Sequence, residues 1–265
     1  MAYIPNFTRI NTGVFDSTDG RLKMVSGVCY LPRNCNLPKS SEQDAYFVCD
    51  EEGAIGVADG ADHAGDYARE LMTRSVYAVQ DEFQTKGGVV NLRKALNKAF
   101  SNTKSKGSST VCMVTLQGSH IHGINVGNSG FEIFRDSKFQ CRSAIQRRGV
   151  DDTFRLGNSS MCDKPNCAQQ MRVTVKDGDV VVVGTDGLFD NVASKEIEDI
   201  LEKEPTKDNS PEHLARKIAE LALHNSMDKS ILTPFAEACQ EAGYNYVGGK
   251  VDDITVIVGL IQKAD

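Results

Sequence analysis

Four aspartates in the sequence stand at the ends of short apolar runs that are typical of buried strands. Asp59 and Asp186 each follow such a run and precede a glycine, Asp252 comes shortly before a third run, and Asp44 precedes a fourth. A single Asp-Gly pair usually closes a turn. Four carboxylates at strand ends predict more, because strands of one sandwich can bring them to a common edge, where their repulsion is costly unless a cation offsets it.

The expected cation is a hard one. The five histidines form no His-x-x-x-His pair with a neighbouring acid, which argues against a zinc or non-haem iron site. Oxygen ligands select Mg²⁺ or Mn²⁺. Two such ions that share a carboxylate activate a water and hold the oxygens of a phosphoryl group, so these residues predict hydrolysis of a phosphate ester.

A cysteine phosphatase is the competing enzyme class. Cys141 and Arg147 have the required spacing of a cysteine, five residues and an arginine. A phosphate cradle needs backbone amides freed by glycines before a helix, and no glycine lies between these two residues. The spacing is therefore interpreted as a chance match.

The eight cysteines are expected to be mostly reduced thiols of an intracellular protein. Two of them, Cys49 and Cys112, lie in apolar runs and are expected in the core. A zinc site is the alternative for four others, but neither pair has the Cys-x-x-Cys spacing. Those four are Cys29, Cys35, Cys162 and Cys167.

Hydrophobic patterning predicts the elements that position the aspartates. Strands are expected at 23–30, 45–49, 54–58, 111–116, 121–126, 131–135, 171–175, 180–184 and 254–260. Helices are expected at 65–83, 90–104, 194–202 and 211–224. The last helix has Ser210 as its N-cap and Pro211 at its first position.

Short turns between strands predict antiparallel hairpins. Helices that come between groups of strands then pack on the outer faces of stacked sheets, which gives an α+β sandwich. No repeat or linker divides the chain, so one domain over residues 1–265 is expected. The polar stretch 141–168 is expected to be an exposed flap or functional loop.

Composition excludes several classes. The chain has 265 residues, 40% hydrophobic and 25% charged, as in ordinary globular proteins. It has no apolar run near the roughly 20 residues of a membrane-spanning helix. The net charge of −6 and the lack of a Lys/Arg cluster argue against nucleic-acid binding. Residues 1–15 contain no apolar stretch of signal-peptide length, so export is not expected.

Several motifs resemble the protein phosphatase 2C family, metal-dependent serine/threonine phosphatases. Residues 183–191, Val-Gly-Thr-Asp-Gly-Leu-Phe-Asp-Asn, resemble the family's Asp-Gly-hydrophobic-aromatic-Asp signature, and residues 251–256 resemble its terminal strand motif. Segments 43–45, 58–60 and 125–130 agree in order. The resemblance spans nearly the whole chain. It implies a four-layer α/β/β/α sandwich with two central, mostly antiparallel sheets, and phosphoserine or phosphothreonine in proteins as the substrate.

A branch of the family that includes mitochondrial phosphatases is closest in two segments. One is residues 106–110, Lys-Gly-Ser-Ser-Thr, and the other runs from Thr-Pro-Phe-Ala at 233–236 to Gly-Gly-Lys at 248–250. This implies the mitochondrial matrix, with the cytoplasm as the alternative. Residues 1–21 make a poor transit peptide, because they hold two aspartates and only two arginines.

The resemblance also implies a dinuclear Mn²⁺ or Mg²⁺ site. By position, Asp59 bridges both ions and Asp186 and Asp252 complete the first site, while the carbonyl of Gly60 helps to hold the second. Asp59 and Asp186 then act in catalysis through the water that the ions activate. Asp253 falls where the family often has Asn and is expected to support the ligands.

Two departures from the family concern metal binding. Gln43 stands where the family has the acidic ligand of the second metal, so weaker binding is expected unless Asp44 substitutes. Asn128 replaces the Asp that helps to hold a third ion in the family, which weakens the case for that ion.

Further departures concern the substrate. Ala61 replaces a residue that is often His and proposed as general acid, so water protonates the leaving group unless Asp62 or His63 reaches in. For phosphate binding, Lys39 lies near the family's basic residue and Arg33 lies further off, with a solvated surface cation as the alternative for each.

These departures keep a second function open, a pseudophosphatase that binds a protein partner with weak or no catalysis. The three aspartates of the first site argue for an enzyme, because a binding module has no physical need for converging charges. Phosphoproteins are the expected partners, and no residue identifies which ones.

Overall fold

Two antiparallel five-stranded sheets form the centre of the computed structural model, which describes residues 21–33, 42–61, 65–150 and 152–264. The first sheet has the order β1, β12, β11, β7, β8, with bounds Leu22–Leu31, Ile254–Lys263, Val180–Gly184, Gly130–Arg135 and Lys138–Arg142. The second has the order β10, β6, β5, β3, β2, with bounds Gln169–Thr174, His120–Val126, Val111–Gln117, Ala54–Asp59 and Asp44–Cys49. A two-stranded sheet pairs β4 (Ser108–Ser109) with β9 (Leu156–Gly157).

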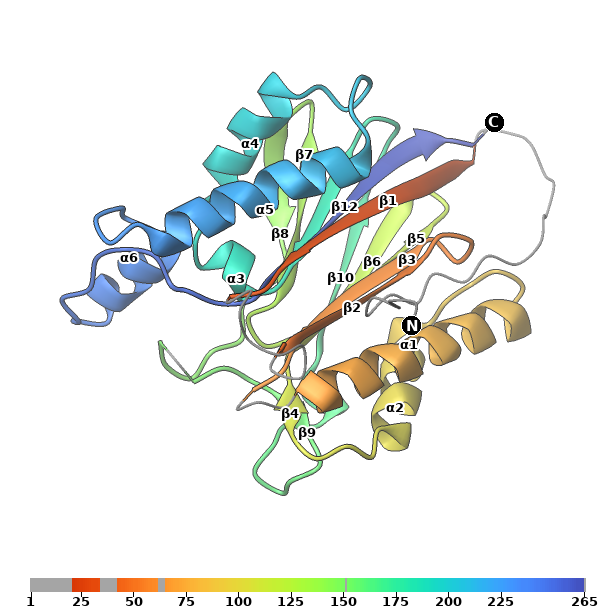
Figure 1. Cartoon of the computed structure of the whole chain (residues 1–265). Coiled ribbons are helices and arrows are strands. Elements are labelled where there is room, and N and C mark those ends of the chain that lie inside the picture. Colours follow the sequence, from red (N-terminus) through yellow and green to blue (C-terminus); the bar gives the residue numbers. More distant parts are fainter. Residues whose placement is uncertain (1–20, 34–41, 62–64, 151, 265) are drawn as a thin grey trace, which may run out of the picture.

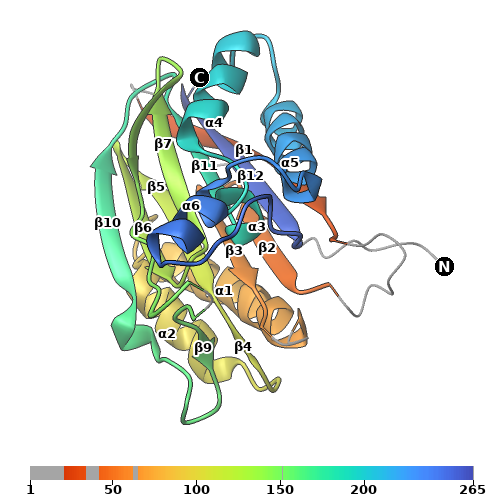
Figure 2. The ribbon, with the colours of Figure 1, turned by 90° about the vertical axis from the view of Figure 1, so that its left-hand side faces the viewer.

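Helices cover the outer face of each sheet, so that four layers follow one another (Figures 1 and 2). Helices α1 (Gly65–Thr85) and α2 (Leu92–Asn102) lie on the second sheet. Helices α4 (Ser194–Lys203) and α5 (Pro211–Met227) lie on the side of the first sheet. Two short helices, α3 (Asp186–Phe189) and α6 (Pro234–Glu241), lie near one end of the sandwich (Figure 1). The predicted four-layer α+β sandwich is confirmed.

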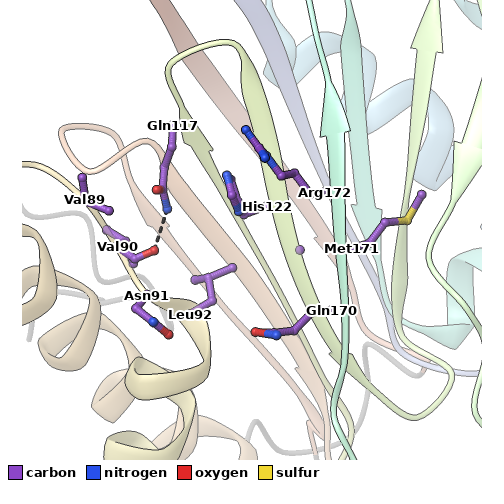
Figure 3. A pocket seen from close by; sticks show the side chains of 10 residues that line it. Val89, Val90, Asn91, Leu92, Gln117, His122, Gln170, Met171 and Arg172 are labelled. Atoms are coloured by element: carbon purple, nitrogen blue, oxygen red, sulfur yellow. Dashed lines mark hydrogen bonds between the residues drawn. The ribbon is translucent and has the colours of Figure 1, made fainter.

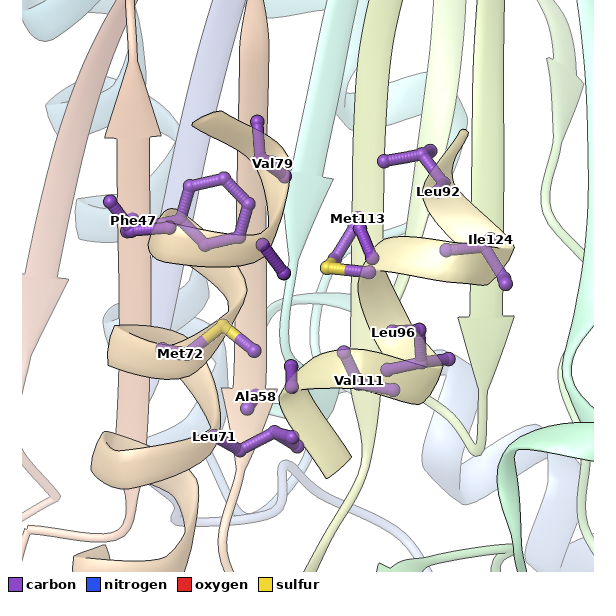
Figure 4. Packing of buried hydrophobic residues seen from close by; sticks show 14 of the residues in the cluster. Phe47, Ala58, Leu71, Met72, Val79, Leu92, Leu96, Val111, Met113 and Ile124 are labelled. Atoms are coloured by element: carbon purple, nitrogen blue, oxygen red, sulfur yellow. The ribbon is translucent and has the colours of Figure 1, made fainter. Parts of the chain in front are cut away.

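Three hydrophobic clusters fill the spaces between the layers. Phe47, Leu71 and Leu96 belong to the cluster between the second sheet and its helices, where Figure 4 shows their side chains. Leu188 and Ile218 belong to the cluster on the other side of the molecule. The third cluster lies between the sheets and contains residues of both, which explains why the central strands read as nearly unbroken apolar runs.

The predicted strands and long helices are present within a few residues of their expected bounds. Ser210 caps α5 by accepting a hydrogen bond from the backbone N–H of His213, with Pro211 at the first position, as predicted. Helix α2 begins later than expected, at Leu92, because the side chain of Asn91 caps it. Across the described ranges, no helix has both the length and the apolar character that a bilayer span requires.

The stretch 141–168 is mostly irregular, as expected, but two corrections apply. Its first two residues, Cys141 and Arg142, belong to the edge strand β8, whose alternating burial reflects the alternation of polar and apolar residues at 138–142. Its middle is held down by the pairing of β9 with β4 and by a 3-10 turn at Pro165–Cys167. Its first two residues therefore belong to the first sheet, and its later part is held by the pairing of β9 with β4 and by contacts of the 3-10 turn with α2.

Candidate active site

The four predicted aspartates lie at the same end of the sandwich, where strands of both sheets begin or end. Asp44 opens β2 and is directly paired with Asp59 at the end of β3. Asp186 is the first residue of α3, immediately after β11, and Asp252 precedes β12. Gly187 lets α3 lie directly against β12, because a Cβ there would overlap the backbone carbonyl of Asp253.

Asp44 joins the two sheets through one carboxylate oxygen. Its Oδ2 accepts hydrogen bonds from Thr185 Oγ1 at 2.8 Å and from Thr255 Oγ1 at 2.6 Å. Burial, and then the neighbouring charge of Asp59, raise the pKa of Asp44, which the two hydroxyl donors only partly offset. With Oδ2 held by both threonines, Asp44 is oriented by protein contacts.

Asp59 is buried beside two other carboxylates. Its backbone is held on both sides by Thr110, whose Oγ1 accepts from Asp59 N at 3.1 Å and whose N–H donates to Asp59 O at 2.9 Å. Burial raises the pKa of Asp59 well above its usual range, and Asp186 and Asp252 raise it further. A carboxylate in this position is favoured in its charged form only when a cation is close.

Asp186 has one oxygen with partners and one without. Its Oδ2 accepts from Lys250 Nζ at 2.6 Å and from Asn128 Nδ2 at 2.9 Å, whereas the buried Oδ1 makes no hydrogen bond. Burial would raise the pKa of Asp186, but Lys250, Arg147 and Asn128 outweigh burial and lower it. The unpartnered Oδ1 is an available ligand atom.

Asp252 completes the group around Lys250, whose Nζ lies 3.4 Å from Asp252 Oδ2. Burial, and then the charge of Asp186, raise the pKa of Asp252 to about 6. Lys250 also contacts Asp190 Oδ2 at 3.0 Å, and Arg147 forms an ion pair with the other oxygen of Asp190. The centre therefore mixes carboxylates with two cationic side chains.

Asp253 holds the chain around the site. Its carboxylate accepts from the backbone N–H of Arg33 at 2.8 Å and from that of Gln43 at 2.7 Å. The carbonyl of Gln43 in turn accepts from Gly60 N at 3.0 Å, which fixes Gln43 opposite Gly60. These contacts agree with the supporting role expected for Asp253.

The carboxylate and amide oxygens at the site are of the types that bind hard cations. The buried oxygens without partners, Asp186 Oδ1 and Asn128 Oδ1, are of the kind that Mg²⁺ and Mn²⁺ prefer. Among the residues that the structure describes, no three His, Cys, Asp or Glu side chains are close enough together to hold a metal as they stand. Lys250 lies among the carboxylates instead.

Three predicted substrate contacts, Lys39, Asp62 and His63, fall outside the described residues. Ala61 is buried, and its methyl side chain cannot act as a general acid. Arg33 contacts the site through its backbone N–H, which donates to the carboxylate of Asp253.

The structure does not support Cys141 as the nucleophile of a cysteine phosphatase. Burial raises the pKa of the Cys141 thiol, opposite to what a nucleophile needs, and Arg147 is engaged with Asp190. None of the cysteines that the structure describes forms a disulfide, and Cys49 and Cys112 are buried as predicted. Cys35 lies outside the described residues.

A separate cavity of about 360 Å³ lies beside the start of α2, on the outer face of the second sheet (Figure 3). Its polar lining includes Asn91, Gln117, His122 and Arg172. No carboxylate lines it, so its donor set does not suit a hard cation.

Sequence reasoning missed the two cationic side chains and the threonines. Lys250 and Asp190 lie in the motifs at 248–250 and 183–191, and a lysine two residues before Asp252 is a signal for a cation near the site. The position of Arg147 in the sequence does not indicate its contact with Asp190. Thr185 and Thr255 adjoin the motif carboxylates, and their contacts with Asp44 depend on the packing of the two sheets.

Several curated relatives are named as protein phosphatases. "Probable protein phosphatase 2C 80" of Arabidopsis thaliana is 42% identical over 250 residues, which cover 92% of this chain and 60% of the relative. "Protein phosphatase PTC7 homolog fig" of Drosophila mojavensis is 32% identical over 252 residues, which cover 84% of this chain and 79% of the relative. The chain thus spans less than two thirds of the Arabidopsis relative. No family model matches the sequence.

Solved structures share the fold. "X-ray structure of the photosystem II phosphatase PBCP" aligns with a TM-score of 0.80 and 26% identity, over 90% of this chain and 99% of that one. The catalytic domain of the serine threonine protein phosphatase PstP, in complex with 2 manganese ions, aligns with a TM-score of 0.62 and 15% identity, over 91% and 99%. With its motifs, its four-layer fold and these relatives, the chain belongs to the protein phosphatase 2C family.

Proposed function

We propose that the protein hydrolyses phosphoserine and phosphothreonine in protein substrates, using two Mn²⁺ or Mg²⁺ ions held by Asp59, Gly60, Asp186 and Asp252. The observation that carries the proposal is the convergence of buried carboxylates from both sheets, with Asp186 Oδ1 free of hydrogen bonds. Membership of the family and the manganese ions of the PstP structure support the choice of chemistry.

When bound, the cations supply Lewis acidity, which lowers the pKa of a water and offsets the charge of the phosphoryl group. The chain's own residues keep the ligands in place. Thr110 fixes the backbone of Asp59, and hydrogen bonds from Lys250 and Asn128 orient the carboxylate of Asp186. Asp253 fixes Gln43 opposite Gly60, so that either Gln43 or Asp44 supplies the remaining oxygen of the second site.

Protonation of the leaving group falls to water in this proposal, because Ala61 occupies the position of the family's candidate acid. The serine or threonine oxygen leaves as an alkoxide and takes its proton from solvent. We also infer that Lys39 contacts the substrate phosphate, as its place ahead of the first acidic motif suggests.

Hydrolysis of a phosphothreonine peptide by the purified protein tests the proposal. In Mn²⁺ the parent protein should release phosphate and the Asp59→Asn protein should lose at least about 99% of that rate, since the shared ligand is gone. Asp81→Asn, at an exposed aspartate on α1 that pairs with Lys98, should keep the parent rate. A folded parent protein with no turnover at millimolar Mn²⁺ would instead favour the protein-binding module, to which Gln43 and Asn128 point.

A further inference from the structure

We propose that Lys250 is a resident counter-ion of the acidic centre, which stabilises the metal-free fold and competes with a divalent cation for Asp186. The competition with a cation rests on the proposed function, whereas the stabilisation of the metal-free fold does not.

The ammonium of Lys250 is surrounded by carboxylates. It lies 2.6 Å from Asp186 Oδ2, 3.0 Å from Asp190 Oδ2 and 3.4 Å from Asp252 Oδ2. Its fourth side faces the ring of Phe235, with Nζ 5.4 Å from the ring centroid. This environment, three anions and an aromatic face, is one that recognises a cation.

The segment 228–251 is folded so as to bring Lys250 to this place. Two backbone hydrogen bonds close its base, from Gly248 N to Ile231 O at 2.9 Å and from Gly249 N to Asp228 O at 2.8 Å. A glycine is required at 249, because a Cβ there would overlap the carbonyl of Asn225.

Helix α6 ties the segment to the acidic centre. Thr233 caps the helix and its Oγ1 also donates to Gly248 O at 2.9 Å, while Phe235 N donates to Asp190 O at 3.0 Å. Asn191, next to Asp190, holds the backbone of Lys250 on both sides, accepting from its N–H at 2.9 Å and donating to its carbonyl at 2.8 Å. The Thr-Pro-Phe-Ala motif at 233–236 and the Gly-Gly-Lys motif at 248–250 thus both help to position this ammonium.

The buried charges around Lys250 determine how it affects the stability of the metal-free protein. Asp186 and Asp190 are almost fully buried and Asp252 is partly buried, and Lys250 contacts all three. Removing one partner of a buried ion pair is strongly destabilising, because the remaining charge has lost its compensation. Without a bound metal, the fold at this end therefore depends on Lys250.

The same contact opposes metal binding. A divalent cation at Asp186 has to share the carboxylate with an ammonium 2.6 Å from Oδ2, and a positive charge at that range repels the cation. Removal of the ammonium should accordingly make metal binding tighter while it makes the metal-free protein less stable. A role in loop packing alone does not produce these opposite effects.

Thermal unfolding of Lys250→Met, measured in chelator and in Mn²⁺, tests the proposal. In chelator its Tm should lie about 6 °C or more below that of the parent. The rise in Tm on adding Mn²⁺ should be larger than in the parent, and calorimetric titration should give a Kd for Mn²⁺ lower by about tenfold. Lys217→Met, which removes an exposed lysine 3.9 Å from Glu220 on α5, should change neither quantity.

Two more variants keep the test decisive if Lys250→Met does not fold. Lys250→Arg keeps the charge and should keep most of the stability in chelator. Asp252→Asn combined with Lys250→Met removes a carboxylate whose ion pair is with Lys250, and should recover part of the Tm lost in chelator.

An equal Tm for Lys250→Met and the parent in chelator would overturn the counter-ion role. An equal Kd for Mn²⁺ in both proteins would overturn the competition. If Mn²⁺ does not raise the Tm of the parent, the proposed function fails, while the comparison in chelator still decides whether Lys250 supports the metal-free fold.

Discussion

Individual carboxylates at the site differ in what offsets their charge. Asp186 has an ammonium and an amide on one oxygen, Asp44 has two hydroxyls, and Asp59 has neighbouring charges that raise its pKa. Lys250 and Arg155 offset only part of the rise in the pKa of Asp59. A carboxylate whose charge is incompletely offset gains most from a bound cation, and Asp59 is the expected bridging ligand.

Replacing Gln43 by Glu should strengthen metal binding. Gln43 lies opposite Gly60, where a carboxylate would add one negative charge to the second site. A hard cation binds more tightly as the ligand charge rises, so the Mn²⁺ concentration for half-maximal phosphate release should fall by about tenfold. Gln140→Glu, on the exposed edge strand β8, is the matched control and should leave it unchanged. An unaltered Mn²⁺ requirement in Gln43→Glu would show that this position does not reach the metal.

Asp253 illustrates how one side chain serves several elements. It stands just before β12 of the first sheet and holds the backbone at Gln43, just before β2 of the second. Asp253→Ala leaves two buried or partly buried N–H groups without an acceptor, which should lower the free energy of unfolding by about 2–5 kcal/mol. Urea denaturation measures this loss, with Asp66→Ala, at an exposed residue of α1, as the control. A urea midpoint within error of the parent's would contradict the role of Asp253 in joining the two sheets.

Glu70 on α1 gives a pH dependence away from the metal ligands. Burial opposes its charge, but the backbone N–H groups of Ser105 and Lys104, at 2.7 and 2.9 Å, and Arg74 lower its pKa to about 2. A carboxylate whose pKa is lower in the folded state stabilises the fold above its unfolded pKa, and that stability is lost as the pH falls toward the folded value.

Glu70→Gln should therefore be less stable than the parent at pH 7, and the difference should shrink as the pH falls from about 4.5 toward 2. Chemical denaturation across that range measures it. A difference that stays constant with pH would mean that the charge of Glu70 does not act on the connection between α1 and the segment after α2.

The elements that were predictable carry a local hydrophobic pattern. Strands β11 and β12 are apolar runs rich in β-branched residues, and α1 has apolar residues on one face. Helix α3 has only four residues, Asp186–Phe189, too few for a period. Helix α6 did carry a start signal, Thr233 followed by Pro234, the same kind that identified α5 at Ser210 and Pro211.

At the site, the metal-ligand candidates were predictable because aspartates at strand ends are visible in the sequence. The contacts of Lys250 were not, because they depend on Asn191 and on the closure of a loop between α5 and β12. Such long-range pairing follows from tertiary packing, which no local pattern encodes. The same reason hid the hydroxyl contacts of Asp44, which cross from one sheet to the other.

The whole molecule depends on the core between its sheets. Ile257 on β12 is fully buried in that cluster, with Val57 and Cys112 of the facing sheet in the same cluster. Ile257→Ala leaves a cavity between the layers and should lower the free energy of unfolding by about 2–5 kcal/mol. Ile145→Ala, at a side chain that is 42% exposed, should change it by less than about 0.5 kcal/mol. Equal losses in urea denaturation would contradict a sandwich held together by this layer.

Carboxylates from the two sheets are proposed to hold the cations that drive phosphate-ester hydrolysis. The most direct test is the rate of hydrolysis of an aryl phosphate by the purified protein, titrated with Mn²⁺ and then quenched with chelator, beside Asp186→Ala. Turnover should rise with Mn²⁺, stop on chelation and be absent in the variant. Turnover that persists in chelator, or that Asp186→Ala retains in full, would contradict it.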